Sequence, residues 1–199
     1  MNLIIIIAGK LVMNSLCLIF FDKNMKRQSN KLLILVALVI TIFHTGHSQS
    51  ISRITMQPIK MVYVADTVKT MDSISSKMGK DYGTLFIFIG KNQLKPGKLM
   101  AIYHTSEAPW IFDVAVEVDR FPGHLMENVQ FKNTDSGDAV VLHFKGPYEQ
   151  LDKAYLQIDE WLKKNDKQKA GAPIEVYLNN PSAVKDKSEL LTDIYQLIK

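Results

Sequence analysis

The chain has 199 residues, of which 47% are hydrophobic and 22% charged, and its formal net charge is +4 at pH 7. The positive excess lies wholly in residues 1–48, where one acid, Asp22, accompanies the basic residues Lys10, Lys23, Lys26, Arg27 and Lys31. Residues 49–199 carry equal numbers of acidic and basic side chains, so their charge gives no case for nucleic-acid binding. The one cysteine, Cys17, also lies outside them, which excludes a disulfide, a thiolate nucleophile and a cysteine-bound metal there.

Residues 1–48 have the layout of a secretory leader. Met25-Lys26-Arg27 gives a positive start, residues 32–43 are apolar, and Gly46-His47-Ser48 offers small residues for cleavage before Gln49. We therefore predict that Met25 is the true start and that a domain of residues 49–199 is exported, to the periplasm or outside the cell. The apolar run is shorter than the roughly 20 residues that span a bilayer. The alternative is an uncleaved segment that tethers the domain to a membrane.

The first half of the predicted domain contains strand-like and helical segments in turn. Residues 52–65 alternate apolar and polar side chains, which indicates a strand. Apolar residues then recur at spacings of three and four from Met71 to Ile89, which predicts a helix. After a turn at Lys95-Pro96-Gly97, residues 98–103 and 111–118 are predicted to form two strands.

The second half begins near Phe121 and repeats this order. Residues 139–144 form a valine-rich strand, and a helix follows Gly146-Pro147 with its apolar face ending at Leu162. Residues 174–178 and 191–198 are the closing strands. The order strand–helix–strand–strand thus occurs twice, which predicts an α+β fold with two helices packed on an antiparallel sheet.

The two halves also share a local motif. Aligning Gly97 with Gly171 places Tyr103 on Tyr177 and Ala101 on Glu175. A duplicated unit with an acid in only one copy indicates a pseudo-symmetric cleft that holds one asymmetric ligand anchor.

The second half carries a run of motifs in a fixed order: Gly146-Pro147-Tyr148, Ala154-Tyr155, Trp161-Leu162, Gly171 with Pro173, Glu175 with Tyr177, Asn180-Pro181 and Thr192-Asp193-Ile194-Tyr195. This run resembles the GyrI-like small-molecule-binding domain, also known as the effector-binding domain of AraC-type regulators. The resemblance is clear over residues 137–199 and fainter over 52–120. It implies two pseudo-repeats around a groove that binds small organic molecules, often cationic or aromatic, with the family's groove glutamate at Glu175.

The spacing of the acids and tyrosines supports a binding site independently. Glu175 and Tyr177 share a strand face, and Asp193 and Tyr195 repeat the arrangement on the following strand. If these strands are neighbours, two carboxylates and two phenols line one surface, which suits an organic cation. The alternative is that the acids are exposed strand residues and the tyrosines are ordinary core.

Three further aromatic residues are candidates for the groove. Tyr103 is expected to flank Glu175 because it matches Tyr177 in the repeat. Tyr148 is either a groove wall or a packing residue at the helix start. Trp110 either caps the groove or is a surface aromatic residue.

The sequence therefore favours a ligand-binding module over an enzyme. It contains no nucleophile elbow, phosphate loop, dinucleotide fingerprint or metal-binding histidine spacing, so no catalytic residue, metal or cofactor is predicted. The family's regulators carry a DNA-reading domain beside this one, whereas only the leader accompanies it here, so a stand-alone exported form is expected. Two alternatives remain open, a hydrolase of a reactive small molecule with Glu175 as its base, and a protein-interaction module. The oligomeric state is left open.

Overall fold

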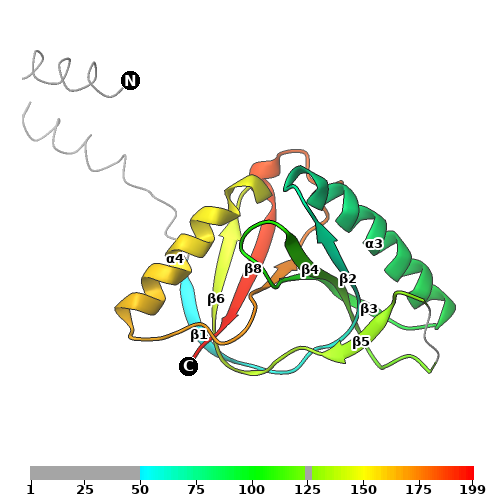
Figure 1. Ribbon diagram of the computed structural model, residues 1–199, viewed down its shortest axis with the longest axis horizontal. Coiled ribbons are helices and arrows are strands. Elements are labelled where there is room, and N and C mark those ends of the chain that lie inside the picture. Colours follow the sequence, from blue (N-terminus) through cyan, green and yellow to red (C-terminus); the bar gives the residue numbers. More distant parts are fainter. Residues whose placement is uncertain (1–49, 124–126) are drawn as a thin grey trace, which may run out of the picture. The chain divides into compact units, whose positions relative to one another are not determined.

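The computed structural model describes residues 50–123 and 127–199, which form one antiparallel sheet and two long helices (Figure 1). The helices are α3 (Asp72–Lys91) and α4 (Leu151–Lys164). The strands are β1 (Ile51–Met56), β2 (Lys60–Val68), β3 (Pro96–Tyr103), β4 (Trp110–Val118), β5 (Gln130–Asn133), β6 (Gly137–Lys145), β7 (Ile174–Tyr177) and β8 (Leu191–Leu197). The sheet has eight strands in the order β1-β6-β8-β7-β3-β4-β2-β5.

The sheet order is that of two equivalent units joined at the centre. The first unit is β2-α3-β3-β4 and the second is β6-α4-β7-β8, and β3 pairs with β7 so that Ala101 lies directly opposite Glu175. Outward from this pair, β4 corresponds to β8 and β2 to β6. The predicted duplicated α+β fold is confirmed, and the two segments that share the Gly–Tyr motif occupy equivalent places.

The strand that precedes each unit pairs with the other unit. β1 runs antiparallel to β6, although it comes directly before β2 in the chain. In the same way β5 precedes β6 but pairs with β2. The two edge strands of the sheet, β1 and β5, therefore each pair with the unit that does not follow them directly in the chain.

Two details of the predicted strands were wrong. The segment 52–65 is not one strand, because β1 ends at Met56 and β2 begins at Lys60. Pro58 lies between them and has no backbone N–H for a strand ladder. The strand β5 was not predicted, since its four residues are mostly exposed and show no apolar alternation.

Both helices pack on the same face of the sheet. Leu85 and Phe88 of α3 lie in one core with Val114 of β4, whereas Ile158 of α4 lies in another with Ile194 of β8. Val114 faces Ala101, and Glu175 faces Ile194 across the neighbouring strands, and directly opposite residues share a face. The helices therefore flank the central strands on the side that carries Glu175.

The reverse face of the sheet has a core of its own. It is built from buried apolar side chains of several strands, among them Met61, Met100 and Val176. Both faces of the sheet are therefore covered by apolar packing.

No helix within residues 50–123 and 127–199 is long and apolar enough to cross a membrane. The predicted leader lies outside the described residues, and its role stays a prediction.

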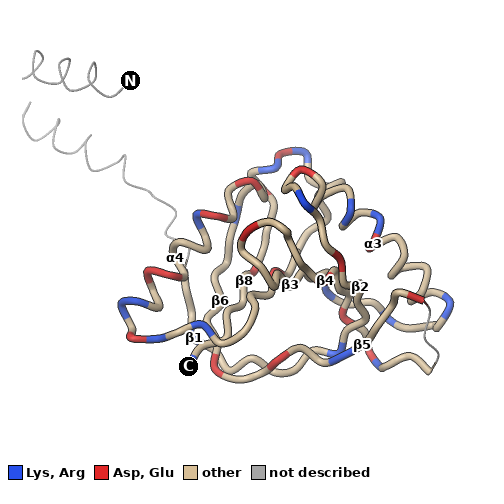
Figure 2. The backbone as a smooth tube through the Cα atoms, in the orientation of Figure 1, with Lys and Arg blue, Asp and Glu red and all other residues tan. Residues whose placement is uncertain are grey.

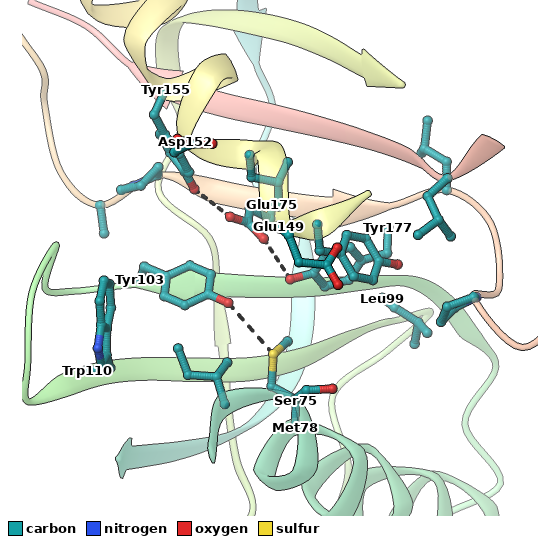
Figure 3. Close-up of a pocket in the computed structure, with 18 of the residues that line it drawn as sticks. Ser75, Met78, Leu99, Tyr103, Trp110, Glu149, Asp152, Tyr155, Glu175 and Tyr177 are labelled. Atoms are coloured by element: carbon teal, nitrogen blue, oxygen red, sulfur yellow. Dashed lines mark hydrogen bonds between the residues drawn. The ribbon is translucent and has the colours of Figure 1, made fainter. Parts of the chain in front are cut away.

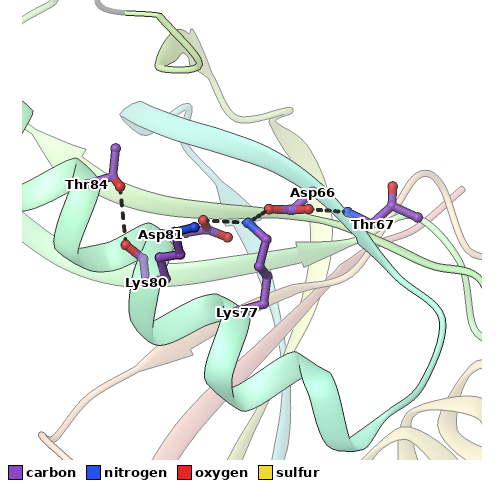
Figure 4. A network of polar contacts seen from close by, with 6 residues as sticks. All are labelled: Asp66, Thr67, Lys77, Lys80, Asp81 and Thr84. Atoms are coloured by element: carbon purple, nitrogen blue, oxygen red, sulfur yellow. Dashed lines mark hydrogen bonds and ion pairs between the residues drawn. The ribbon is translucent and has the colours of Figure 1, made fainter.

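A pair of salt bridges links α3 to β2 (Figure 4). Lys77 of α3 pairs with Asp66 of β2 and, through Nζ at 2.9 Å, with Oδ1 of Asp81 one helical turn further on. Asp81 is buried, and its Oδ2 atom has no hydrogen-bond partner among the described residues. The lysine is therefore the cation that keeps two carboxylates close together beneath the helix.

We predict that Lys77→Met destabilises the fold by about 3 kcal/mol, because it leaves the two carboxylates facing one another without a cation. The free energy of unfolding in urea measures the effect. Lys80→Met is the matched control on the same helix, since the Lys80 side chain is exposed and forms no ion pair with the described residues. That control should stay within about 0.5 kcal/mol of the unchanged protein. Equal losses in both variants would contradict the bridge.

Candidate functional site

A groove of about 1900 Å³ lies over the central strands β3 and β7, between α3 and α4 (Figure 3). Glu175 and Tyr177 of β7 and Tyr103 of β3 line it from the sheet. Met78 of α3 and Tyr155 of α4 line it from the helices. The pairing of β3 with β7 and the packing of both helices on this face therefore bring the two units together around one space.

Glu175 is buried in this groove, with 3% of its surface exposed. The hydroxyl of Tyr155 donates to Oε1 at 2.7 Å, and the hydroxyl of Tyr177 donates to Oε2 at 2.7 Å. No basic side chain of residues 50–123 or 127–199 lies within ion-pair distance of the carboxylate. Burial raises the pKa of Glu175, and the hydrogen bonds from the two tyrosines lower it in part.

Tyrosine side chains surround this carboxylate. Burial, and next the charge of Glu175, raises the pKa of Tyr103, Tyr155 and Tyr177, so these phenols stay protonated at neutral pH. The pKa of Tyr148 is raised by the same two causes, and its ring meets that of Tyr177 edge to face with centroids 5.4 Å apart. Neutral phenols at these positions serve as hydrogen-bond donors and as aromatic walls.

One tyrosine on each helix follows the pseudo-twofold arrangement, but the two hydroxyl groups donate to different kinds of acceptor. Tyr82 of α3 and Tyr155 of α4 hold corresponding places, one turn before the buried Leu85 and Ile158. Tyr155 donates to Glu175, whereas Tyr82 donates to the backbone carbonyl of Met100 at 2.9 Å. The two equivalent tyrosines thus differ in their acceptor, a side-chain carboxyl group in one unit and a backbone carbonyl in the other.

The remaining predicted aromatic residues also lie in the groove. Tyr103 donates a long hydrogen bond of 3.7 Å to the sulfur of Met78, and Trp110 stands beside Tyr103 at the start of β4 (Figure 3). Trp110 and Tyr148 are both half-buried and both line the space. A contact of Tyr148, as a groove wall, or of Trp110, as a groove cap, with a ligand stays a prediction.

Asp193 and Tyr195 were wrongly placed in the groove. The strands β7 and β8 are neighbours as expected, but Glu175 lies opposite Ile194, so that Asp193 lies opposite Val176. Directly opposite residues share a face, and Asp193 and Tyr195 therefore point to the reverse face of the sheet.

On that reverse face the two residues form a separate polar group. His143 Nδ1 lies 2.6 Å from Asp193 Oδ1, and the Tyr195 hydroxyl donates to Asp193 Oδ2 at 3.4 Å. Asp193 and Tyr195 are not among the residues that line the groove.

Sequence reasoning missed Tyr82 and Tyr155 as groove residues. Both fall on apolar helical stripes, and Tyr155 is part of the Ala154-Tyr155 motif. Spacing of three and four residues identifies the inward side of a helix but does not separate the part over the core from the part over a groove. Equivalent tyrosines at matching helical positions in both repeats were the available signal.

Comparison with known proteins agrees with this arrangement. Residues 51–199 match the family described as the GyrI-like small molecule binding domain. The chain belongs to this GyrI-like family. Comparison with curated proteins finds no significant match.

Solved structures with the same fold include EcmrR. In the EcmrR–DNA complex, that chain is 19% identical with a TM-score of 0.68, and the match covers 83% of this chain and 65% of EcmrR. The chain thus spans slightly less than two thirds of the whole EcmrR protein. The EcmrR C-terminal domain alone is 20% identical with a TM-score of 0.63, over 76% of this chain and 98% of that one.

Another solved structure with a similar fold is that of SAV2435 bound to tetraphenylphosphonium. It is 9% identical with a TM-score of 0.53, over 75% of this chain and 94% of that one. At these identities, the three similarities show the fold.

The groove combines an acidic group with aromatic side chains. Its floor holds a buried carboxylate whose hydrogen bonds come from neutral phenols, and its walls are aromatic. A cation held against the rings gains about 0.5–2 kcal/mol from their faces in addition to the charge pairing. Within the described residues, no group of His, Cys, Asp and Glu side chains has the arrangement of a metal site.

We predict that Glu175→Gln changes stability in a pH-dependent way. The raised pKa means that the folded protein binds this proton more tightly than the unfolded chain, so the contribution of Glu175 to stability is full at low pH and is lost as pH rises through the folded pKa. Glutamine does not ionise, so the variant does not lose stability in this way as the pH rises. It should gain stability relative to the unchanged protein at pH 8, on the order of 1–3 kcal/mol.

Urea unfolding of both proteins at pH 4 and pH 8 measures this difference. The gap between them should be larger at pH 8 than at pH 4. A variant that is less stable by the same amount at both pH values would show that the carboxylate is a structural contact.

Proposed function

We propose that the domain binds a small organic cation in the groove between α3 and α4. The observation that carries this proposal is Glu175, a buried carboxylate without a basic partner among the described residues, surrounded by tyrosines. Burial of an uncompensated charge is costly. A cationic ligand supplies the missing counter-charge, and a neutral ligand of the same shape does not.

The hydrogen bonds around Glu175 hold its carboxyl group in place. Tyr155 donates to Oε1 and Tyr177 donates to Oε2. Each oxygen keeps a second lone pair that can face a ligand. The two phenols fix the carboxylate in one orientation, which suits a permanent electrostatic anchor.

The relatives support the same class of ligand. Tetraphenylphosphonium, the molecule bound by SAV2435, is an organic cation with aromatic rings. The groove of the present domain offers aromatic side chains from both units, including Tyr103, Tyr148 and Trp110, for a molecule of that kind.

We predict that Glu175→Gln lowers the affinity for tetraphenylphosphonium by about one to two powers of ten, since a charge-assisted contact is worth roughly 1.5–3 kcal/mol. Isothermal titration calorimetry with this cation and with neutral triphenylphosphine oxide measures the effect. The neutral compound should lose much less.

Glu160→Gln is the charge-matched control, because Glu160 is an exposed residue of α4 that does not line the groove. Equal losses for the cation and the neutral compound in Glu175→Gln would point to a structural role. An unchanged affinity for the cation would place its site elsewhere.

We also propose that the domain works outside the cytoplasm. The support is the sequence of residues 25–48, with a basic start, an apolar run and small residues before Gln49. N-terminal sequencing of the protein from its native cells should begin at or near Gln49. Recovery of a soluble cytoplasmic protein that retains Met25 would contradict export.

A further inference from the structure

The two helical walls of the groove differ in charge. The groove-lining residues of α3 carry no charge; they are Met71 at its N-terminal edge, then Ile74, Ser75, Met78, Gly79, Tyr82 and Phe86. The α4 side presents three acids at helical spacing, Glu149 just before the helix and Asp152 and Asp159 within it. A ligand in the groove therefore meets an uncharged helix on the α3 side, and on the α4 side three acids together with Lys169 and Lys187.

Asp152 is the acid of this wall that is free to meet a ligand. Glu149 is paired with Lys187 at 3.0 Å, and Asp159 is paired with Lys169 at 2.6 Å. Asp152 is exposed and has no ion pair or hydrogen bond with any residue of 50–123 or 127–199. Its negative charge is thus uncompensated at the rim.

One side chain connects this rim to the floor of the groove. Tyr155 follows Asp152 by three residues on α4, so both lie on the same side of the helix. Its hydroxyl reaches down to Oε1 of Glu175 at 2.7 Å (Figure 3). The tyrosine therefore spans the groove wall between two carboxylates, one buried and one exposed, and neither has a basic partner among the described residues.

Building on the proposed binding of a cation at Glu175, we propose that Asp152 is a second cation contact that makes the groove prefer an extended organic dication. One positive group lies above Glu175, the linker follows the side of Tyr155, and the other positive group reaches Asp152 at the rim. A monocation leaves the charge of Asp152 unpaired.

Asp152 also lies in the first turn of α4, where an acid is favourable near the positive end of the helix. That structural role is independent of how many charges a ligand carries. The comparison that isolates the proposed contact is therefore between a monocation and a dication with the same linker.

The test uses alkyl chains of two lengths, with hexyl- and decyltrimethylammonium as monocations and the corresponding α,ω-bis(trimethylammonium) hexane and decane as dications. The measured quantity is the dication preference, the ratio of the monocation Kd to the dication Kd, from calorimetry at low ionic strength. Asp152→Asn should reduce this preference by roughly two- to fivefold for the better-fitting length, the size of an exposed ion pair. Glu160→Gln removes one charge from α4 away from the groove and should leave the ratio unchanged.

The outcomes separate this inference from the proposed function. A dication preference that is the same in Asp152→Asn and the unchanged protein overturns the role of Asp152, and so does an equal reduction in Glu160→Gln. If the monocations bind and Glu175→Gln weakens them while Asp152→Asn has no effect, the groove still binds cations and only the second contact fails. If none of the four probes binds while tetraphenylphosphonium does, the second contact fails and the proposed function stands; if tetraphenylphosphonium does not bind either, both proposals fail.

Discussion

The carboxyl group of Glu175, buried without a basic partner among the described residues, is the constraint around which the groove is organised. Its two oxygens accept hydrogen bonds from Tyr155 and Tyr177, which come from α4 and β7. Phenols donate hydrogen bonds without neutralising the charge, so the carboxylate is fixed in place while its charge remains available. A lysine or arginine in place of either tyrosine would supply a permanent counter-charge inside the protein. The site thus trades local stability for an unpaired charge, as binding sites often do.

The frame that holds this charge is the pairing of β3 with β7. Because each unit packs its own helix on the same face, the two helices end up on either side of the shared central strands (Figure 2). The strands β1 and β5 then close the outer edges by crossing to the other unit. The groove is therefore bounded by elements whose relative positions are fixed by one continuous sheet.

Much of this arrangement could be predicted from periodicity within single segments. The spacing of apolar residues from Met71 to Ile89 identified α3, and the two-residue period placed Glu175 and Tyr177 on one face. Register between strands was not accessible in the same way, because a shift of one residue exchanges the two faces. That is why Asp193 and Tyr195, with the same spacing as Glu175 and Tyr177, were assigned to the wrong side of the sheet. The short strand β5 has no pattern of its own and is defined by its pairing with β2.

Ala101 lies opposite Glu175, so the two equivalent positions at the centre of the duplication carry different residues. A symmetric dimer of two identical units would place the same residue on both sides of this central pair. With glutamate there, two carboxylates would occupy directly opposed positions, whose Cβ atoms are about 4.5–5.5 Å apart, and like charges at that separation destabilise a sheet. Joining the units in one chain frees the two positions to differ. Covalent linkage is thus what permits a single acidic residue beside an axis of near symmetry, and with it a groove whose two ends differ chemically.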